Sequence, residues 1–534
     1  MAGRRRVLLG AAAAAAAPLA ARLAAPAVAQ TARPLRFVPH ANLSVLDPVA
    51  STAYVTRNHG FLVWDTLYGV DESFSARPQM LEGHEVSADG LAWTFTLREG
   101  LRFHDGEPVR SADCLASIAR WSKRDAMGAR LAQLSLGTET LDDRRFVIRL
   151  SRPFPMLPDA LAKPGSVACF IMPQRIAEAD PFRPFGPGSV IGSGPFRFLA
   201  AEFVPGARVV YERFRDYAPR PSGAPSFTAG PKIARIDRVE WTVIPDPATA
   251  AAALRTGEID WWERTTADLH PLLARDPSVV VAVPDRLGFI ATFRPNHLHP
   301  PFDNPRLRRA LLAAFNQADF GAAIAGTDPR FWTVGVGVFA PDTPLATDAG
   351  LESLRFDPDR ARRLVAESGY GGEPVVILAA TDVPATKAMS EVGAAALRRI
   401  GLTVDYQAMD WGSVVRRLGS REPPDRGGWN GYFSSWAGLD HINPAGHLVL
   451  RGNGSQGFIG WPESAEIERL RDAWFDASDL AEQRRIAAAL QRQAMIDVPY
   501  VPLARFFLPL AHRRGLVGVA QPAGIPLFWG VGRA

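Results

Sequence analysis

The sequence has little cysteine, with only Cys114 and Cys169 among 534 residues. Both lie among apolar neighbours, and their spacing does not match that of a metal-ligand pair. Free cysteine behaves as a small buried hydrophobe, whereas a disulfide is typical of an oxidising compartment. The sequence leaves both alternatives open: two buried thiols, or a bridge across a separation of 55 residues.

Catalytic signatures are also missing. The chain has no His-Glu-x-x-His, no paired Cys-x-x-Cys, no Gly-x-Ser-x-Gly turn and no phosphate loop ending in Gly-Lys-Ser/Thr. Residues Gly452–Gly457 fit the spacing GxGxxG, but Gly460 and Pro462 prevent a helix from starting there, which favours a polar loop. We therefore expect no enzyme, no metal site and no cofactor. A secreted hydrolase is the alternative that a turnover assay would test.

A marked excess of charge is missing once the first residues are set aside. The formal charge is +5, but residues 1–30 contain four arginines and no acid, which leaves about +1 for the remainder. A nearly neutral chain has no electrostatic reason to bind nucleic acid or an anionic membrane. Its length of about 500 residues predicts two to four domains.

The N-terminus has the three parts of a secretory signal. Arg4, Arg5 and Arg6 precede an apolar, alanine-rich run that closes at residues 27–29, which predicts a signal peptide over 1–30 cleaved near Ala29. Arg5-Arg6 followed by Val-Leu-Leu resembles the twin-arginine type. Arg22 interrupts the run too early for a membrane span, and no cysteine follows for a lipid anchor. We expect an exported protein that has no direct membrane anchor.

Hydrophobic periodicity and capping residues indicate a mixed α/β chain. Strands and helices alternate in two parts of the sequence, which is the signature of βαβ units. Between residues 93 and 121, alternating apolar residues, an Asp-Gly turn and a helix capped by Ser111 predict a small α+β block with antiparallel strands. The main predictions are strands at 34–38, 236–244, 374–379 and 402–406, and helices at 53–68, 111–121, 247–256, 304–315, 357–369, 384–400, 465–475 and 480–496.

The segment 427–444 mixes aromatic rings, amides and glycines with a single acid. Aromatic walls with a few polar groups are typical of small-ligand clefts. We predict that ligand-binding residues lie here, namely Trp429, Asn430, Tyr432, Trp436, Asp440 and His441. The alternative is a strand and loop whose aromatics pack in the core and whose Asp440 caps a turn before Pro444.

Several blocks resemble one family in both sequence and order. They are Trp93–Val109 with Ala112-Asp113, Gly192–Phe196, Ala252–Asp260, Pro301–Leu311 and Asp357–Tyr370. Together they resemble the large periplasmic solute-binding proteins of bacterial ABC importers, the extracellular family 5 type that includes oligopeptide-, dipeptide- and nickel-binding members.

The resemblance implies an α/β, periplasmic-binding-protein-like fold. Two α/β lobes are joined by two crossovers, and an extra α+β domain lies beside the first lobe. It assigns residues 31–66, 190–287 and 500–534 to the first lobe, 67–189 to the extra domain and 288–499 to the second lobe. The lobes are expected to close around a solute by hinge motion.

The resemblance also implies a function. The protein would be a periplasmic monomer that captures a peptide or peptide-like solute and delivers it to ABC permease subunits. In peptide-binding members the acid of a Trp-x-x-Asp motif pairs with the α-ammonium of the ligand; Asp440 matches it, one residue later after Trp436. Trp429 and Trp436 would supply apolar walls, and His441 leaves a metal chelate, an opine or another non-peptide solute open. A sensor or chaperone on the same fold is a further alternative.

Overall fold

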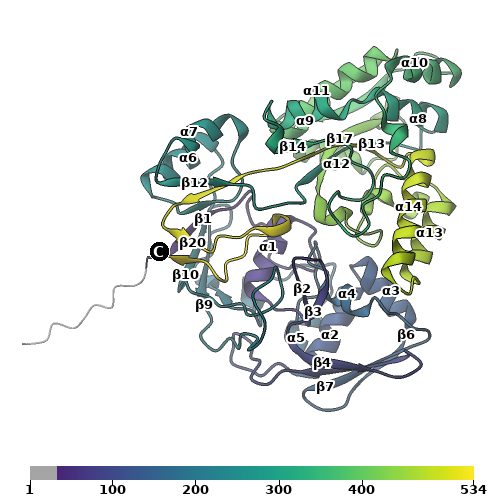
Figure 1. Ribbon diagram of the computed structural model, residues 1–534. Helices are drawn as coiled ribbons and strands as arrows, with labels where there is room; N and C mark the ends of the chain where they lie inside the picture. Colours follow the sequence, from purple (N-terminus) through teal and green to yellow (C-terminus); the bar gives the residue numbers. More distant parts are fainter. Residues whose placement is uncertain (1–32) are drawn as a thin grey trace, which may run out of the picture. The chain divides into compact units, whose positions relative to one another are not determined.

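The computed structural model describes residues 33–534, so the predicted signal peptide lies outside the described residues. The first lobe is built on a seven-stranded mixed sheet (Figure 1). In spatial order its strands are β12 (Val279–Ala282), β19 (Leu510–Arg513), β11 (Trp261–Trp262), β1 (Leu35–Val38), β10 (Arg238–Thr242), β9 (Arg208–Arg213) and β8 (Phe196–Phe198).

A βαβ unit forms the centre of this sheet, because β10 and β11 both pair with β1 in parallel. The helix between them, α6 (Pro247–Thr256), begins at Asp246, whose side chain accepts a hydrogen bond from the backbone of Thr249. It ends at Gly257, which adopts φ +81°, a left-handed conformation that suits glycine. The predicted range 247–256 is thus confirmed. The lobe also holds α1 (Tyr54–Val63) and α7 (His270–Ala274).

The second lobe is built on a six-stranded sheet. Its spatial order is β14 (Trp332–Thr333), β18 (Val501–Phe506), β13 (Phe289–Pro295), β17 (Gly431–Ala437), β15 (Val375–Ala380) and β16 (Val404–Met409). The helices of this lobe are α8 (Pro305–Ala314), α9 (Gln317–Ala325), α10 (Pro358–Glu367), α11 (Pro384–Arg399), α12 (Trp411–Leu418), α13 (Ala465–Phe475) and α14 (Leu480–Asp497).

The third part is an antiparallel sheet with short helices, as the sequence predicted. Its strands run in the order β4 (Leu81–Val86), β5 (Ala92–Leu97), β7 (Arg145–Leu150) and β6 (Ser135–Thr140). Its helices are α2 (Ser111–Ser122), α3 (Ala126–Leu134), α4 (Leu157–Ala162) and α5 (Gln174–Ala177).

Two small antiparallel ribbons complete the described strands. One pairs β2 (Tyr68–Val70) with β3 (Ala76–Pro78), and the other pairs β20 (Leu516–Val517) with β21 (Gly532–Arg533).

The cysteines belong to this block, and the structure decides between the two alternatives. Cys114 and Cys169 are both buried and both free, so the disulfide is not formed. Burial in an apolar environment raises the pKa of both thiols, which keeps them in the neutral form. In this structure they act as core side chains and form no bridge.

Two connections join the lobes. Residues 283–288 lead from β12 to β13, and residues 507–509 lead from β18 to β19. Strand pairing places β18 in the second sheet, whereas the sequence analysis gave residues from 500 onward to the first lobe; the connection therefore falls after Phe506. The domain boundaries as a whole stay a prediction. No helix within residues 33–534 is long and apolar enough to cross a membrane.

The first connection has a tight backbone arrangement. Asp285 accepts hydrogen bonds from the backbone N–H groups of Leu287 and Gly288, at 2.9 and 3.1 Å. Gly288 has φ +60°, and a Cβ atom there would lie 2.5 Å from the carbonyl oxygen of Phe506. Only glycine combines this conformation with so close an approach. The two chain segments that link the lobes can therefore run side by side.

Candidate ligand-binding site

A cavity of about 780 Å³ lies where the three parts of the molecule meet. Residues 51–54 reach it from the first lobe, residues 124–126 and 163–167 from the antiparallel block, and residues 411–459 from the second lobe. Much of its wall is apolar, with side chains that include Trp411, Val415, Leu418, Trp436, Leu439 and Phe458. A concave, mainly apolar space with a few polar groups suits a small organic ligand.

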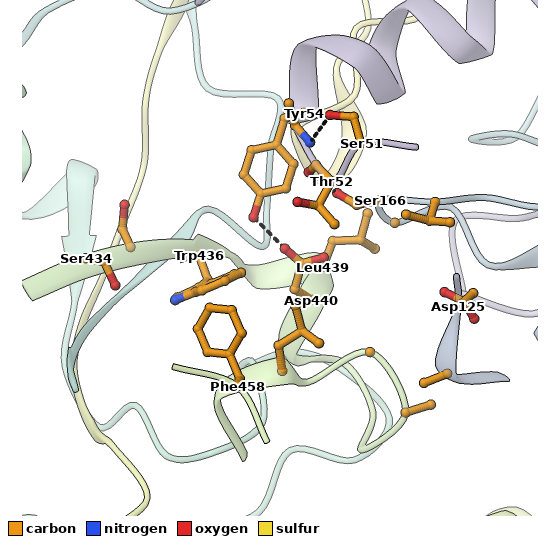
Figure 2. A pocket seen from close by; sticks show the side chains of 18 of the residues that line it. Ser51, Thr52, Tyr54, Asp125, Ser166, Ser434, Trp436, Leu439, Asp440 and Phe458 are labelled. Carbon is orange, nitrogen blue, oxygen red and sulfur yellow. Dashed lines mark hydrogen bonds between the residues drawn. The ribbon is translucent and has the colours of Figure 1, made fainter. Parts of the chain in front are cut away.

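Strand β17 forms one wall and divides its side chains between the cavity and the core. Tyr432, Ser434 and Trp436 line the cavity, and Ser435 reaches it as well. Phe433 instead packs in the core against Phe293, with ring centroids 4.7 Å apart. Alternate residues of a strand point to opposite faces, which explains this division. Figure 2 shows Trp436 beside Phe458, and their ring centroids are 5.4 Å apart.

Asp440 follows the strand in the short helix η7 (Gly438–His441) and lines the cavity. Its Oδ2 accepts a hydrogen bond of 2.5 Å from the hydroxyl of Tyr54, which belongs to the first lobe (Figure 2). The same hydroxyl accepts a hydrogen bond of 2.9 Å from the backbone N–H of Ala437. Tyr54 is therefore bonded twice to the second lobe.

The other oxygen of Asp440 is unused by the protein. Within residues 33–534, Oδ1 accepts no hydrogen bond, and no lysine or arginine nitrogen lies within 4.0 Å of the carboxylate. Burial raises the pKa of Asp440, although the hydrogen bond from Tyr54 and the charges of Arg57 and Lys163 oppose this rise. A partly buried carboxylate without an ion-pair partner can hold a cation that comes from outside.

The antiparallel block contributes an ion pair close to Asp440. Lys163 Nζ lies 2.5 Å from Asp125 Oδ2 and donates to the carbonyl oxygen of Ser166 at 2.6 Å. Asp125 also begins α3, accepting hydrogen bonds from the backbone of Met127 and Gly128. Asp125 thus neutralises the charge of Lys163. The charge of Asp440 has no ion-pair partner among the described residues.

The remaining three predicted site residues lie behind the cavity wall. Trp429 is fully buried against Tyr432, with centroids 5.5 Å apart. Asn430 joins two chain segments: its Nδ2 donates to the carbonyl of Pro300, and its Oδ1 accepts from the backbone of Val376, each at 2.8 Å.

His441, the next residue after Asp440, is also buried. Its ring stacks on His447 at 4.1 Å between centroids, and burial lowers the pKa of His441 to about 3, so it is neutral. The structure therefore brings Asp440, Trp436 and Tyr432 together on the cavity wall and leaves Trp429, Asn430 and His441 out of it.

Sequence analysis missed the wall that comes from other segments. Residues 51–54 and 163–167 carry no motif, and only their approach in the fold makes them part of the cavity. Helix α12 was missed although it carries a signal: Asp410 caps its first turn, and Trp411, Val414, Val415 and Leu418 have the i, i+3, i+4, i+7 spacing of an apolar helix face.

The side chains present limit the chemistry of the cavity. Within the described part of the chain, no histidine or cysteine lines it. Across the same residues, no group of three or more His, Cys, Asp or Glu side chains could hold a metal ion. The lining combines apolar walls with the carboxylate of Asp440, the ion pair of Asp125 with Lys163, and Arg124.

The sequence of this chain is similar to a known protein family and to individual relatives. Residues 75–453 match the family described as bacterial extracellular solute-binding proteins, family 5, middle part. A probable peptide ABC transporter periplasmic-binding protein of Sinorhizobium fredii is 37% identical over 497 residues, which covers 92% of each chain. The glutathione-binding protein of Salmonella typhi is 26% identical and covers 89% of this chain and 90% of its own.

Solved structures share the fold. The dipeptide-binding protein of Pseudoalteromonas sp. SM9913 in complex with Met-Leu has a TM-score of 0.78 at 18% identity and covers 94% of this chain and 100% of its own. The agropinic acid complex of a periplasmic binding protein from Agrobacterium tumefaciens R10 has a TM-score of 0.76 at 21% identity and covers 94% and 99%. The predicted fold of two α/β lobes with an extra domain is confirmed. The chain belongs to family 5 of the bacterial extracellular solute-binding proteins.

Proposed function

We propose that this protein is the periplasmic component of an ABC import system and that it captures a peptide-like solute through the solute's free ammonium group. Asp440 would pair with the ammonium, while Trp436, Tyr432 and the apolar residues opposite them would hold the rest of the solute. The observation that carries the proposal is the carboxylate of Asp440, which faces an apolar cavity with one oxygen that no described residue uses.

The physical basis is the cost of burying an unpaired charge. When one partner of a buried ion pair is removed, the loss commonly amounts to about 3–5 kcal/mol. Ammonium binding at Asp440 would neutralise both charges in a cavity whose walls are mainly apolar. The relative of Sinorhizobium fredii, named as a probable peptide-binding protein, supports a peptide-like solute.

The test is calorimetry of Asp440→Asn with a pool of unblocked dipeptides. We expect the affinity to fall by at least about 100-fold, since each ~1.4 kcal/mol is a factor of ten. Asp268→Asn, at an exposed acid outside the cavity, is the matched control and should bind as the wild type does. A folded Asp440→Asn variant with wild-type affinity would remove Asp440 from the site. Binding of an opine or a nickel chelate in place of peptides would favour the non-peptide alternative.

We also propose that the protein acts as a monomer, has no catalytic turnover and delivers its solute to permease subunits. The absence of histidine and cysteine from the cavity wall within residues 33–534 supports a binding role. Sustained hydrolysis of the dipeptide pool by the pure protein would favour the hydrolase alternative. Export by the twin-arginine route is proposed from Arg5 and Arg6, and replacement of both by lysine tests it.

A further inference from the structure

Tyr54 and Asp440 come from opposite lobes and meet in the cavity. Tyr54 is the first residue of α1, and its hydroxyl donates to Asp440 Oδ2 at 2.5 Å (Figure 2). The hydroxyl is bonded a second time, because it accepts from the backbone of Ala437 at 2.9 Å. Two hydrogen bonds in different directions fix the position of this oxygen relative to the carboxylate.

The ring of Tyr54 is held as firmly as its hydroxyl. The guanidinium carbon of Arg57 lies 4.9 Å above the ring, and the ring of Phe289 meets it edge-on with centroids 6.3 Å apart. Arg57 is itself buried and donates to the carbonyl oxygen of Gly524 at 2.8 Å. Packing of its ring thus holds Tyr54 in the position from which its hydroxyl donates to Asp440 Oδ2.

The contact leaves Oδ1 of Asp440 as the carboxylate oxygen that no described residue uses. Oδ1 faces Gly165 of the antiparallel block, where a Cβ atom would lie 3.5 Å from Oδ1 and 3.9 Å from Lys163 Nζ. Because residue 165 is glycine, the space before Oδ1 is open to a small group. A larger side chain at this position would fill it.

Cationic groups differ in what they need from a carboxylate. A guanidinium is a planar fork that binds best when it donates to both oxygens at once. An ammonium is a compact charge whose donors can each find a separate partner, so one oxygen is sufficient. Because Tyr54 is bonded to Oδ2 and packed beside it, a guanidinium must compete with Tyr54 for Oδ2 to adopt the forked geometry at Asp440.

We propose that Tyr54 is a specificity-determining residue that makes Asp440 favour ammonium groups over guanidinium groups. This inference rests on the proposed function, because it assumes that Asp440 contacts the solute. It narrows the solute to a molecule that presents a primary ammonium to the cavity. Solutes whose only cation is a guanidinium would bind there more weakly.

The experiment compares two probes that differ only in the cationic group: the dipeptide Leu-Phe and its derivative in which the α-amine is converted to a guanidino group. Calorimetry should show that the wild type binds Leu-Phe at least tenfold more tightly than the derivative. In Tyr54→Phe both oxygens of Asp440 become free, and we expect this ratio to fall below threefold. An unchanged ratio in a folded Tyr54→Phe variant would overturn the proposal.

A matched control tests whether the affinity ratio depends on Tyr54 itself or on any contact between parts of the molecule. Asp476, at the end of α13, pairs with Arg130 of α3 at 2.9 Å and with Arg152 at 2.8 Å, and none of the three lines the cavity. Asp476→Ala therefore removes a contact between the second lobe and the antiparallel block without touching Asp440. It should alter the affinity for both probes by the same factor and leave their ratio intact. A changed ratio in this variant would mean that the preference does not depend on Tyr54.

A second variant covers the case in which Tyr54→Phe does not fold. Gly165→Ala places a methyl group before Oδ1 and should weaken Leu-Phe binding at least tenfold, and wild-type affinity would count against the inferred position of the ammonium. Failure of the proposed function looks different. In that case Asp440→Asn binds Leu-Phe as the wild type does, or the wild type binds neither probe.

Discussion

Two carboxylates, the fully buried Asp65 and the half-buried Asp440, each accept a hydrogen bond from a tyrosine, but they differ in their other contacts. Asp65 is inaccessible to solvent and pairs with Lys232, whose Nζ lies 2.7 Å away. It also accepts from Tyr217 at 2.7 Å and from the backbone of Thr66 at 2.9 Å. Both of its oxygens are used, so this charge stabilises the fold and has nothing left to offer a ligand.

Asp440 is the opposite case, because the protein uses only one of its oxygens. The two carboxylates also differ in pKa. Burial would raise the pKa of Asp65, but the charge and hydrogen bond of Lys232 and the hydroxyl of Tyr217 lower it below its ordinary value. For Asp440, burial prevails and the pKa is raised. An incompletely satisfied buried acid is thus a better guide to the binding site than burial or charge alone.

The largest effect is expected when Asp65 loses its partner. Lys232→Met keeps most of the side-chain volume but leaves a buried carboxylate uncompensated, which should lower the free energy of unfolding by about 3–5 kcal/mol. Urea unfolding monitored by circular dichroism measures it. Asp440→Asn removes a charge that has no ion-pair partner and should change stability by less than about 1 kcal/mol. Equal losses in the two variants would break the contrast between a structural and a ligand-binding acid.

The next effect concerns Asp285, in the connection between the lobes. Burial raises the pKa of Asp285 to about 6 from an ordinary value of 3.8, although hydrogen bonds from Gly288 and Leu287 oppose the rise. The native state therefore holds the proton more tightly than the unfolded chain does. The stability that this group contributes is fully present below pH 3.8 and is lost as the pH rises through about 6.

Asp285→Asn should remove the pH-dependent part of the stability that Asp285 contributes. Relative to the wild type, the variant is expected to gain stability between pH 4 and pH 7, by up to about 3 kcal/mol. Chemical unfolding of both proteins at several pH values in this range isolates the effect, since all other groups are common to both. A constant difference between the two proteins would show that Asp285 does not titrate there.

The smallest of the three effects is the pH dependence of binding. Asp440 must be ionised to hold an ammonium, and its raised pKa means that protonation begins at a higher pH than for an exposed aspartate. Affinity for Leu-Phe should therefore fall on acidification, by up to about tenfold per pH unit below that pKa. The charged or titratable groups that act on Asp440 are Tyr54, Arg57 and Lys163. Calorimetry from pH 7 to pH 4 should give a curved profile for the wild type and a flatter one for Asp440→Asn.

Much of the fold could be predicted because its signals are local. The helices predicted at 247–256 and 465–475 occur as α6 and α13 with those bounds, and both have side-chain caps, Asp246 and Ser464. The helix predicted at 53–68 ends earlier, at Val63, after which the backbone of Trp64 is extended. The prediction ran past this end because residues 64–68 are buried although they are not helical. A pattern of apolar residues indicates which residues are buried, and at this helix the buried residues continue beyond its last turn.

The site could be predicted only in part, because its residues come from distant segments. Composition located the segment 427–444, and Asp440, Trp436 and Tyr432 do line the cavity. Composition could not separate these three residues from Trp429 and Asn430. That distinction depends on which side chains of β17, and of the residues just before it, point into the core. The contact between Tyr54 and Asp440 spans 386 residues, and neither residue carries a motif that announces the other.

The arrangement at Gly288 has a consequence for how specificity could be redesigned. This glycine lets the two linking segments pass closely, and it lies outside the set of residues that line the cavity. The connection and the cavity are thus encoded by separate positions. A designer can exchange side chains such as Trp411, Val415 or Phe458 to admit a different solute while the linkage between the lobes stays untouched. The same fold can then serve as a biosensor. Substitutions in the cavity change which solute binds, and the segments that connect the lobes keep their sequence.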